Sequence, residues 1–229
     1  MQLILIIAMV LLGAFLVYTG IPTVAERVRL GRAKANDDKV IYLTFDDGPS
    51  AEYTGKLLDL LDSYHIRASF FIVGEFGEHN KEIIKRMKRE GHFVGIHSLE
   101  HKSEMLRSPA YTNREFKRLI TLFKELDLRP TYFRGAWGEV NLATLFNIKK
   151  YGLTNITWNV MAEDWRASIT AGEIVRRLKK RVTPGSIVCL HDGRGRNKAP
   201  GRTIEALKVT IPYWLDNGYA FKLINEREI

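Results

Sequence analysis

Two adjacent carboxylates, Asp46 and Asp47, stand where an apolar run of β-branched and aromatic residues meets Gly48 and Pro49. A run closed by such a turn predicts a buried strand with the carboxylates at its C-terminal end. Because successive strand residues point to opposite sides, the two carboxylates cannot do the same job unless the turn re-aims one of them. The pair suggests two roles, for instance one carboxylate that binds a metal ion and one that transfers protons. The alternative interpretation is a solvated turn with a helix N-cap.

Two histidines, His97 and His101, are four residues apart. On a helical turn this spacing puts both imidazoles on one face, where one metal ion can bridge them. The spacing alone is also typical of ordinary surface histidines. If one aspartate joins them, the three ligands leave positions on the ion open for water and substrate, which characterises a catalytic rather than a structural metal site.

The chain of 229 residues is 45% hydrophobic, which predicts a globular domain with a full core. Its single cysteine, Cys189, excludes an internal disulfide framework and a zinc site made of cysteines. The formal charge of +9 favours anionic surroundings such as an acidic cell-wall polymer or lipid headgroups. The basic residues are scattered along amphipathic helices, so we interpret them as solvated faces and expect no nucleic-acid partner.

Residues 3–21 are almost wholly apolar, and no charged side chain precedes Glu26. The segment is long enough to span a hydrocarbon core, which needs about 20 residues. We favour a retained transmembrane anchor over a cleaved signal peptide because no basic residue precedes the apolar stretch, although residues 23–25 form a passable cleavage site. The sequence predicts an anchor or signal segment at 1–25, a polar linker at 26–38 and a folded domain at 39–229.

From residue 39 onward, strand-like segments alternate with amphipathic, helix-like segments. Seven strands and six helices in alternation predict an α/β fold with a mainly parallel sheet, either open or closed into a barrel. The strands are expected at 40–46, 68–73, 93–97, 131–134, 155–160, 186–191 and 220–224, and the helices near 52–64, 80–90, 113–127, 141–151, 170–182 and 203–217. Two helix starts carry a capping box, Thr112 with Glu115 and Thr170 with Glu173.

Polar side chains gather where these predicted strands end. The C-terminal ends of parallel strands carry the active site in barrels and open sheets alike. Five of the seven strands end in or lead to such residues, namely Asp46 and Asp47, His97 and His101, Arg134 and Trp137, Asp164 and Trp165, and His191 and Asp192. The sequence therefore predicts one reactive site at this edge of the sheet.

Three segments resemble motifs of the NodB-homology polysaccharide deacetylases, also called carbohydrate esterase family 4. Residues 44–50, TFDDGPS, resemble the first motif without a substitution, residues 97–101, HSLEH, resemble the second, and residues 190–192, LHD, resemble the fifth. The resemblance covers residue 39 to the C-terminus. It implies a distorted (β/α) barrel of about seven parallel strands and the removal of N-acetyl groups from a polymer of N-acetylhexosamine.

The resemblance also implies roles for residues that match the first two motifs. Asp46 would be the general base. Asp47, His97 and His101 would hold a divalent metal ion, with zinc preferred and cobalt or manganese as alternatives. Such an ion polarises a carbonyl and activates a water molecule, which an amide substrate requires.

Further roles follow for the later motifs. His191 would be the general acid, Asp164 would tune it, and Arg134 would hold Asp46. Leu190 would line the pocket for the acetyl methyl group.

Trp137 and Trp165 would offer flat apolar faces to pyranose rings, although aromatic residues at a barrel rim are as often simple packing. Two other positions depart from the family pattern. Ala136 stands where the third motif usually has proline, and Met161 stands where the fourth usually has its first aspartate. Losing the fixed φ of proline would loosen a loop whose backbone N–H at Trp137 would help form the oxyanion site.

We therefore expect a metal-dependent deacetylase of an N-acetylated glycan polymer, with peptidoglycan as the leading substrate and no protein partner. The alternatives are a weak or inactive carbohydrate-binding pseudoenzyme and a deacylase of a small amide. The protein would sit in the cell membrane through one N-terminal helix with its domain outside, or be secreted if that helix is cleaved. The basic residues that follow the apolar segment argue against this orientation, because positively charged flanks of a membrane helix tend to stay in the cytoplasm.

Overall fold

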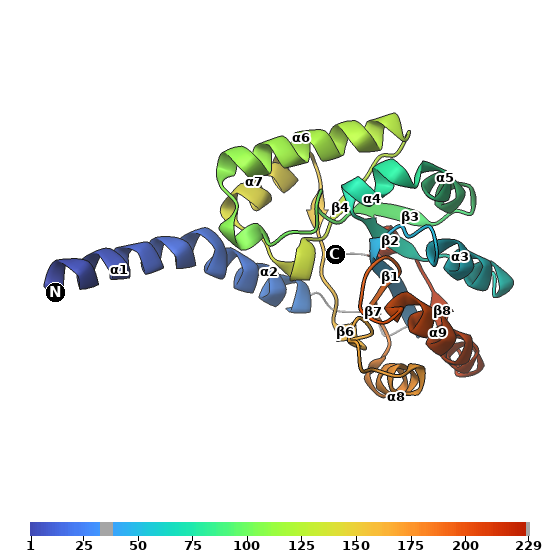
Figure 1. Cartoon of the computed structure of the whole chain (residues 1–229). Coiled ribbons are helices and arrows are strands. Elements are labelled where there is room, and N and C mark those ends of the chain that lie inside the picture. Colours follow the sequence, from blue (N-terminus) through green and yellow to red (C-terminus); the bar gives the residue numbers. More distant parts are fainter. Residues whose placement is uncertain (33–38, 228–229) are drawn as a thin grey trace.

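The strands of the domain form a single sheet in which every described pair runs parallel. The computed structural model describes residues 1–32 and 39–227. The strands are β1 Val40–Gly48, β2 Ser69–Ile72, β3 Phe93–Ile96, β4 Tyr132–Phe133, β5 Thr154–Asn155, β6 Val160–Met161, β7 Ser186–His191 and β8 Ala220–Phe221. Their order is β5-β4-β3-β2-β1-β7-β6, with β8 beside β1, and the sheet curls into a half-barrel (Figure 1). The predicted α/β fold is confirmed.

Amphipathic helices cover the outside of the half-barrel (Figure 1). They are α3 Thr54–Ser63, α4 Gly74–His79, α5 Lys81–Arg89, α6 Pro109–Glu125, α7 Leu142–Lys150, α8 Ala171–Arg181 and α9 Ala199–Asp216, with short 3₁₀ turns at η2 Glu104–Leu106, η3 Ala136–Gly138 and η4 Ile224–Glu226. Each long helix turns an apolar face to the sheet, as expected for crossover helices of a parallel sheet.

The central strand β1 is buried along its whole length. Ile41, Leu43 and Phe45 belong to the large core between sheet and helices, whereas Tyr42 belongs to a smaller cluster with Phe71. This alternation follows the two-residue period of a strand, so side chains at even positions of β1 point into the half-barrel. The even-numbered residues Thr44 and Asp46, which follow Tyr42 in β1, therefore point to the inside of the fold.

Residues 155–160 do not form the single strand that the sequence suggested. Asn155 lies in β5 and Val160 in β6, at the two ends of the sheet path, and residues 156–159 between them belong to neither strand. The backbone N–H of Ile156 donates to Phe133 on one side, and that of Asn159 donates to Ile187 on the other. The segment crosses the open side of the half-barrel, a long-range arrangement that an apolar run cannot reveal.

One of the two predicted helix starts is also wrong. Helix α6 begins at Pro109 and is capped by Ser108, whose hydroxyl accepts a hydrogen bond from the N–H of Tyr111. Proline in the first turn after such a cap is a favourable start, so the helix begins one turn earlier. Thr112 lies inside the helix and is buried. The capping box at the start of α8 is confirmed.

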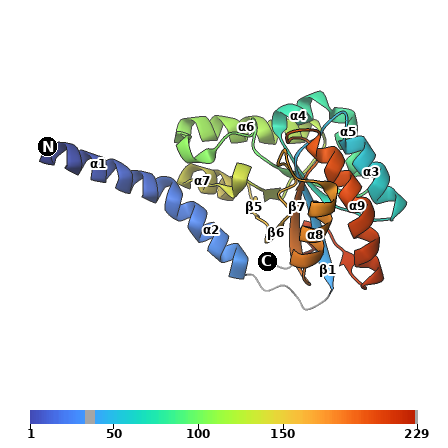
Figure 2. The same cartoon turned by 60° about the horizontal axis from the view of Figure 1, so that its bottom comes forward.

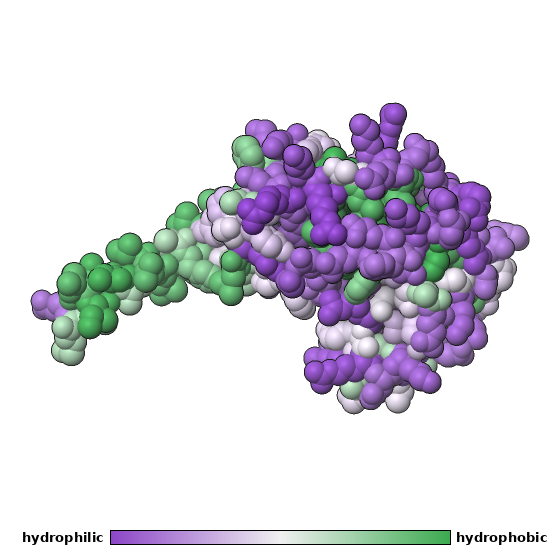
Figure 3. All heavy atoms as spheres, turned by 45° about the horizontal axis from the view of Figure 1, so that its top comes forward, coloured by the Kyte–Doolittle hydropathy of each residue, from purple (hydrophilic) through white to green (hydrophobic). Residues whose placement is uncertain are grey.

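A helical arm precedes the domain (Figures 1 and 2). It consists of α1 Gln2–Phe15, a π-helical stretch η1 Leu16–Gly20 and α2 Ile21–Arg32. The helix Gln2–Leu30 is long and apolar enough to cross a membrane by length and composition. Figure 3 shows the apolar surface of its outer part against a largely polar domain. Part of the expected linker, residues 26–32, is helical, and residues 33–38 lie outside the described residues.

Gly193 permits a close approach between two chain segments beneath the strand ends. A Cβ atom at this position would lie 1.8 Å from the carbonyl oxygen of Asp47. We expect Gly193→Ala to lower the free energy of unfolding by about 1–3 kcal/mol, because backbone must move. Gly172→Ala is the matched control, since no atom of the described part of the chain would lie within 4 Å of an added Cβ, apart from the immediate neighbours in its own helix. That change should be neutral or stabilising by up to about 1 kcal/mol. Thermal unfolding that is equal in both variants would contradict this prediction.

Candidate metal and catalytic site

The two carboxylates at the end of β1 face different surroundings. The register between β1 and β2 shifts between Asp46 and Gly48, and Asp47 has a φ of 70°. This irregularity re-aims Asp47 while Asp46 keeps the inward direction of the strand. Both side chains are buried, with relative exposures of 2% for Asp46 and 6% for Asp47. The pair is therefore not a solvated turn.

Asp47 forms a cluster with the two histidines. Its Oδ1 lies 3.2 Å from Nε2 of His97 and 2.8 Å from Nε2 of His101. Burial raises the pKa of Asp47, but the imidazoles of His101 and His97 outweigh that effect and hold the pKa well below its usual value. An ionised carboxylate and two imidazoles at such distances form a ligand set suited to a divalent ion such as zinc.

Two further observations fit a metal ion in this cluster. Oδ1 of Asp47 is buried and has no hydrogen-bond partner among the described residues, although two ring nitrogens lie close to it. Nδ1 of His97 lies 2.8 Å from the carbonyl oxygen of Arg134, which can only accept, so this nitrogen carries the proton. The Nε2 lone pair of His97 is then directed at the cluster, and metal-binding histidines typically donate their other ring N–H to a carbonyl oxygen in this way.

The loop that brings the histidines together is not a helical turn, contrary to the expectation from their spacing. Residues 97–101 are irregular, and Ser98 and His101 have φ values of 57° and 49°. The backbone N–H of Leu99 donates to Oε1 of Glu115 at 2.7 Å. Glu115, which the sequence assigned to a helix cap, instead supports this loop from inside α6.

Asp46 is held by a buried guanidinium rather than by the metal cluster. Nη1 of Arg134 donates to Oδ1 of Asp46 at 2.7 Å and to the hydroxyl of Thr44 at 2.8 Å. Arg134 is fully buried, with its guanidinium 4.0 Å from the ring centre of Phe71 and 5.6 Å from that of Trp158. The arginine therefore orients one carboxylate beside the cluster of Asp47, His97 and His101.

His191, at the end of β7, is paired with Asp164. The distance from its Nδ1 to Oδ1 of Asp164 is 2.9 Å. The other carboxylate oxygen accepts from the backbone N–H of His191 at 2.9 Å and from the hydroxyl of Thr203 at 2.7 Å. Burial lowers the pKa of His191, but the charge and hydrogen bond of Asp164 outweigh it and raise the pKa to about 9. The imidazole is therefore protonated at neutral pH.

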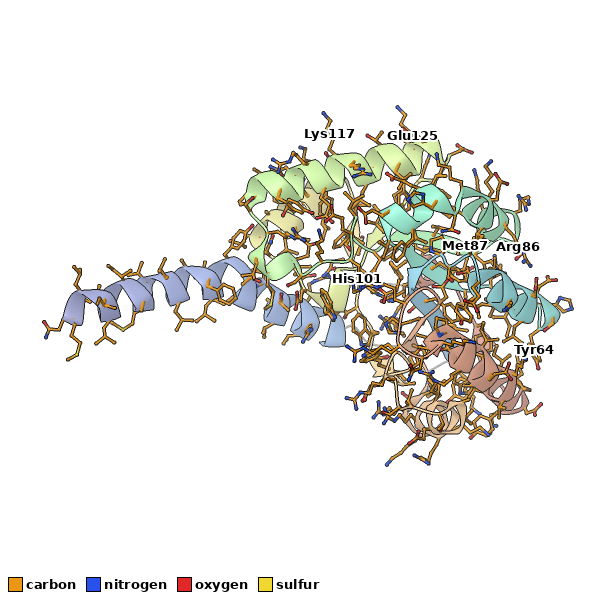
Figure 4. All side chains as sticks on the ribbon, viewed as in Figure 1. Tyr64, Arg86, Met87, His101, Lys117 and Glu125 are labelled. Atoms are coloured by element: carbon orange, nitrogen blue, oxygen red, sulfur yellow. The ribbon has the colours of Figure 1, made fainter. Side chains whose placement is uncertain are left out.

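These groups open into one pocket of about 350 Å³. It is lined by Asp46, Asp47, His97, His101, Trp137, Trp158, Met161, Trp165, His191, Arg194 and Gly195. Figure 4 shows His101 near the centre of the domain, well away from Lys117 and Glu125 on the outer helix α6. The structure thus brings the predicted acid, base and ligand residues to one place.

The aromatic side chains lie at the walls of this pocket. The ring centre of Trp137 is 4.7 Å from that of His101, and the side chain is 52% exposed. The ring centre of Trp165 is 5.2 Å from that of His191. Leu190, which the resemblance placed at the acetyl methyl group, is fully buried in the large core and is not among the lining residues of the pocket.

Sequence reasoning missed several residues that support or line the site. Thr44 could have been predicted as a site residue, because it is the first residue of the motif at 44–50. Trp158 was hidden inside the supposed strand 155–160, and Thr203 reaches Asp164 from 39 positions away in the chain. Only the folded structure brings Thr203 and Asp164 together.

Removal of one ligand tests the metal site. We expect His101→Ala to weaken zinc binding by more than about 100-fold, since one of the three predicted protein ligands is lost. Titration calorimetry on the metal-stripped protein measures the affinity. His79→Ala, an exposed histidine at the end of α4, is the matched control and should bind zinc like the unaltered chain. Equal affinity in both variants would exclude His101 as a ligand.

Comparisons with known proteins identify the family to which the chain is similar. A family model described as polysaccharide deacetylase matches residues 33–156. The chain is 32% identical over 199 residues to a peptidoglycan-N-acetylglucosamine deacetylase of Bacillus cereus, covering 83% of this chain and 89% of the relative. It is 30% identical over 200 residues to a chitooligosaccharide deacetylase of Rhizobium leguminosarum, covering 82% and 91%. The crystal structure of a peptidoglycan N-acetylglucosamine deacetylase in complex with an N-oxidanyl-benzamide matches with a TM-score of 0.78 at 25% identity, covering 84% and 89%.

Proposed function

Because the chain belongs to the polysaccharide deacetylases of carbohydrate esterase family 4, we propose that it is a metal-dependent hydrolase that removes N-acetyl groups from an N-acetylhexosamine polymer. The observation that carries the proposal is the shared pocket. An Asp-His-His ligand set, a separate carboxylate and a protonated imidazole all line it. Metal-assisted amide hydrolysis uses these three kinds of group, which activate the water and the carbonyl, accept a proton and donate one.

The residues of the chain divide the reaction between them. A divalent ion held by Asp47, His97 and His101 would polarise the acetyl carbonyl and lower the pKa of a water molecule. Asp46, which Arg134 orients through a hydrogen bond of 2.7 Å, would accept a proton from the attacking water molecule. His191 donates a proton to the leaving sugar amine.

The loop after β4 completes this arrangement. The backbone N–H of Trp137 donates to the oxyanion that develops on the acetyl oxygen. The exposed ring of Trp137 and the ring of Trp165 pack against the sugar on either side of the reacting group.

Peptidoglycan is the substrate that we propose first. The formal charge of +9 suits an acidic wall polymer, and a relative of similar length is named as a peptidoglycan-N-acetylglucosamine deacetylase. In the same proposal the apolar helix holds the protein in the cell membrane with its domain on the extracellular side. If the helix is cleaved as a signal peptide, the same domain is secreted.

Acetate release tests the reaction. The full chain in detergent is stripped of metal, reloaded with zinc, cobalt or manganese, and incubated with chitooligosaccharides or peptidoglycan. We expect metal-dependent release, and Asp46→Asn should reduce kcat by about 10²- to 10⁴-fold because the proton acceptor is lost. Asp59→Asn, which alters an exposed carboxylate on α3, is the matched control.

The outcomes separate the proposal from its alternatives. Release from the polymer that disappears in Asp46→Asn supports the polysaccharide deacetylase. Release only from short soluble amides would indicate a small-molecule deacylase. Tight metal binding without release from any substrate would indicate a carbohydrate-binding pseudoenzyme and would overturn the proposal.

The pH dependence of kcat tests the role of Asp164. A general acid works only while it is protonated, so activity falls as the pH rises through its pKa. The pKa of His191 is raised to about 9 by Asp164, and Asp164→Asn should bring it down toward or below the ordinary value of about 6.5. We expect the alkaline limb of the kcat profile to move to lower pH, with a larger loss at pH 8 than at pH 6. Superimposable profiles would contradict this role.

A further inference from the structure

The arm helix does not stand free of the domain but packs against it from Tyr18 onward. The Tyr18 hydroxyl donates to the carbonyl of Arg107 at 2.7 Å. Thr19, Thr23 and Leu30 are buried, and their spacing places them along one side of the helix. Figures 1 and 2 both show α2 beside the domain. Residues 18–30 therefore form a docked face.

Two side chains of this docked face reach the loop after β4. The hydroxyl of Thr23 donates to the carbonyl of Val140 at 2.7 Å and accepts from its N–H at 3.1 Å. Nη2 of Arg27 donates to the carbonyl oxygen of Trp137 at 3.0 Å. The same helix thus contacts both ends of the segment 137–140.

This loop has a strained conformation that needs support. Trp137 has φ 55° and ψ 14°, a left-handed conformation that costs a non-glycine residue free energy. The turn also closes tightly, since a Cβ at Gly135 would lie 2.0 Å from the carbonyl oxygen of Glu139. Ala136 lacks the fixed φ that a proline would contribute. Contacts from outside the loop are therefore needed to stabilise the left-handed conformation of Trp137.

Helix α2 also adjoins the other wall of the catalytic pocket. Arg27 and Leu30 line a second cavity of about 360 Å³, together with Gly138 and Trp158. Trp158 is shared with the catalytic pocket and lies over the guanidinium of Arg134. The helix thus borders the side of the half-barrel that the segment 155–160 crosses.

We propose that α2 is a positioning element of the active site, in which Thr23 and Arg27 hold the Trp137 loop in its catalytic conformation. The inference rests on the proposed deacetylase function, because it assigns the Trp137 amide to the oxyanion. Thr23 and Arg27 act through the loop and do not line the catalytic pocket. They would affect turnover more than substrate binding, since the oxyanion forms only in the transition state.

The experiment uses the full chain in detergent, with two pairs of variants. Thr23→Val removes the hydroxyl at constant shape, and Thr23→Ser keeps it. Arg27→Gln removes the guanidinium that contacts Trp137, and Arg29→Gln removes a neighbouring one that contacts Glu26 and the Asn155 carbonyl. Hydrogen exchange of the peptide covering 135–140 is measured beside kcat, KM and zinc affinity.

We expect Thr23→Val and Arg27→Gln to accelerate exchange of the loop and to lower kcat about threefold to tenfold, with KM and zinc affinity unchanged. Thr23→Ser and Arg29→Gln should behave like the unaltered chain. Unchanged exchange, or faster exchange with unchanged kcat, overturns the inference. If the unaltered chain releases no acetate, the proposed function fails, and with it the positioning role. The exchange data then show only whether α2 holds the loop.

Discussion

The rest of the site depends on the buried ion pair between the guanidinium of Arg134 and the carboxylate of Asp46. A fully buried charge is costly unless it is paired, and its partner here is the carboxylate of Asp46. The backbone carbonyl of the same residue fixes the proton on His97, which directs the other ring nitrogen to the metal cluster. One residue of the loop after β4 therefore orients both the proposed base and a proposed metal ligand. Phe71 and Trp158 pack around it and exclude water.

The parts of the fold that follow from local chemistry could be predicted from the sequence. An apolar run followed by a Gly-Pro turn predicts strand β1. The two carboxylates near its C-terminal end, Asp46 and Asp47, line the pocket as expected. Parallel topology follows from the alternation of elements, because crossover helices need it. The grouping of Asp46, His97 and His191 at one edge could be predicted for the same reason.

The rest depends on contacts between distant segments, which composition and spacing do not contain. The Thr-x-x-Glu pattern predicted a helix cap at Thr112. Glu115 instead accepts a hydrogen bond from the backbone N–H of Leu99, and α6 begins at Pro109 with Ser108 as its N-cap. The HxxxH spacing suggested a helical turn, whereas the histidines converge through positive φ angles at Ser98 and His101. In both cases a long-range contact or a tight loop outweighed the local preference.

The docked helix changes what proteolytic processing could do to this protein. Thr23 and Arg27 lie on opposite sides of the bond after Ala25. A peptidase that cut there would release the apolar arm together with Thr23 and leave Arg27 with the domain. The anchored and the released form would then differ in how their loop is held as well as in where they act. Processing at this bond would set the rate of the enzyme and its location in one step.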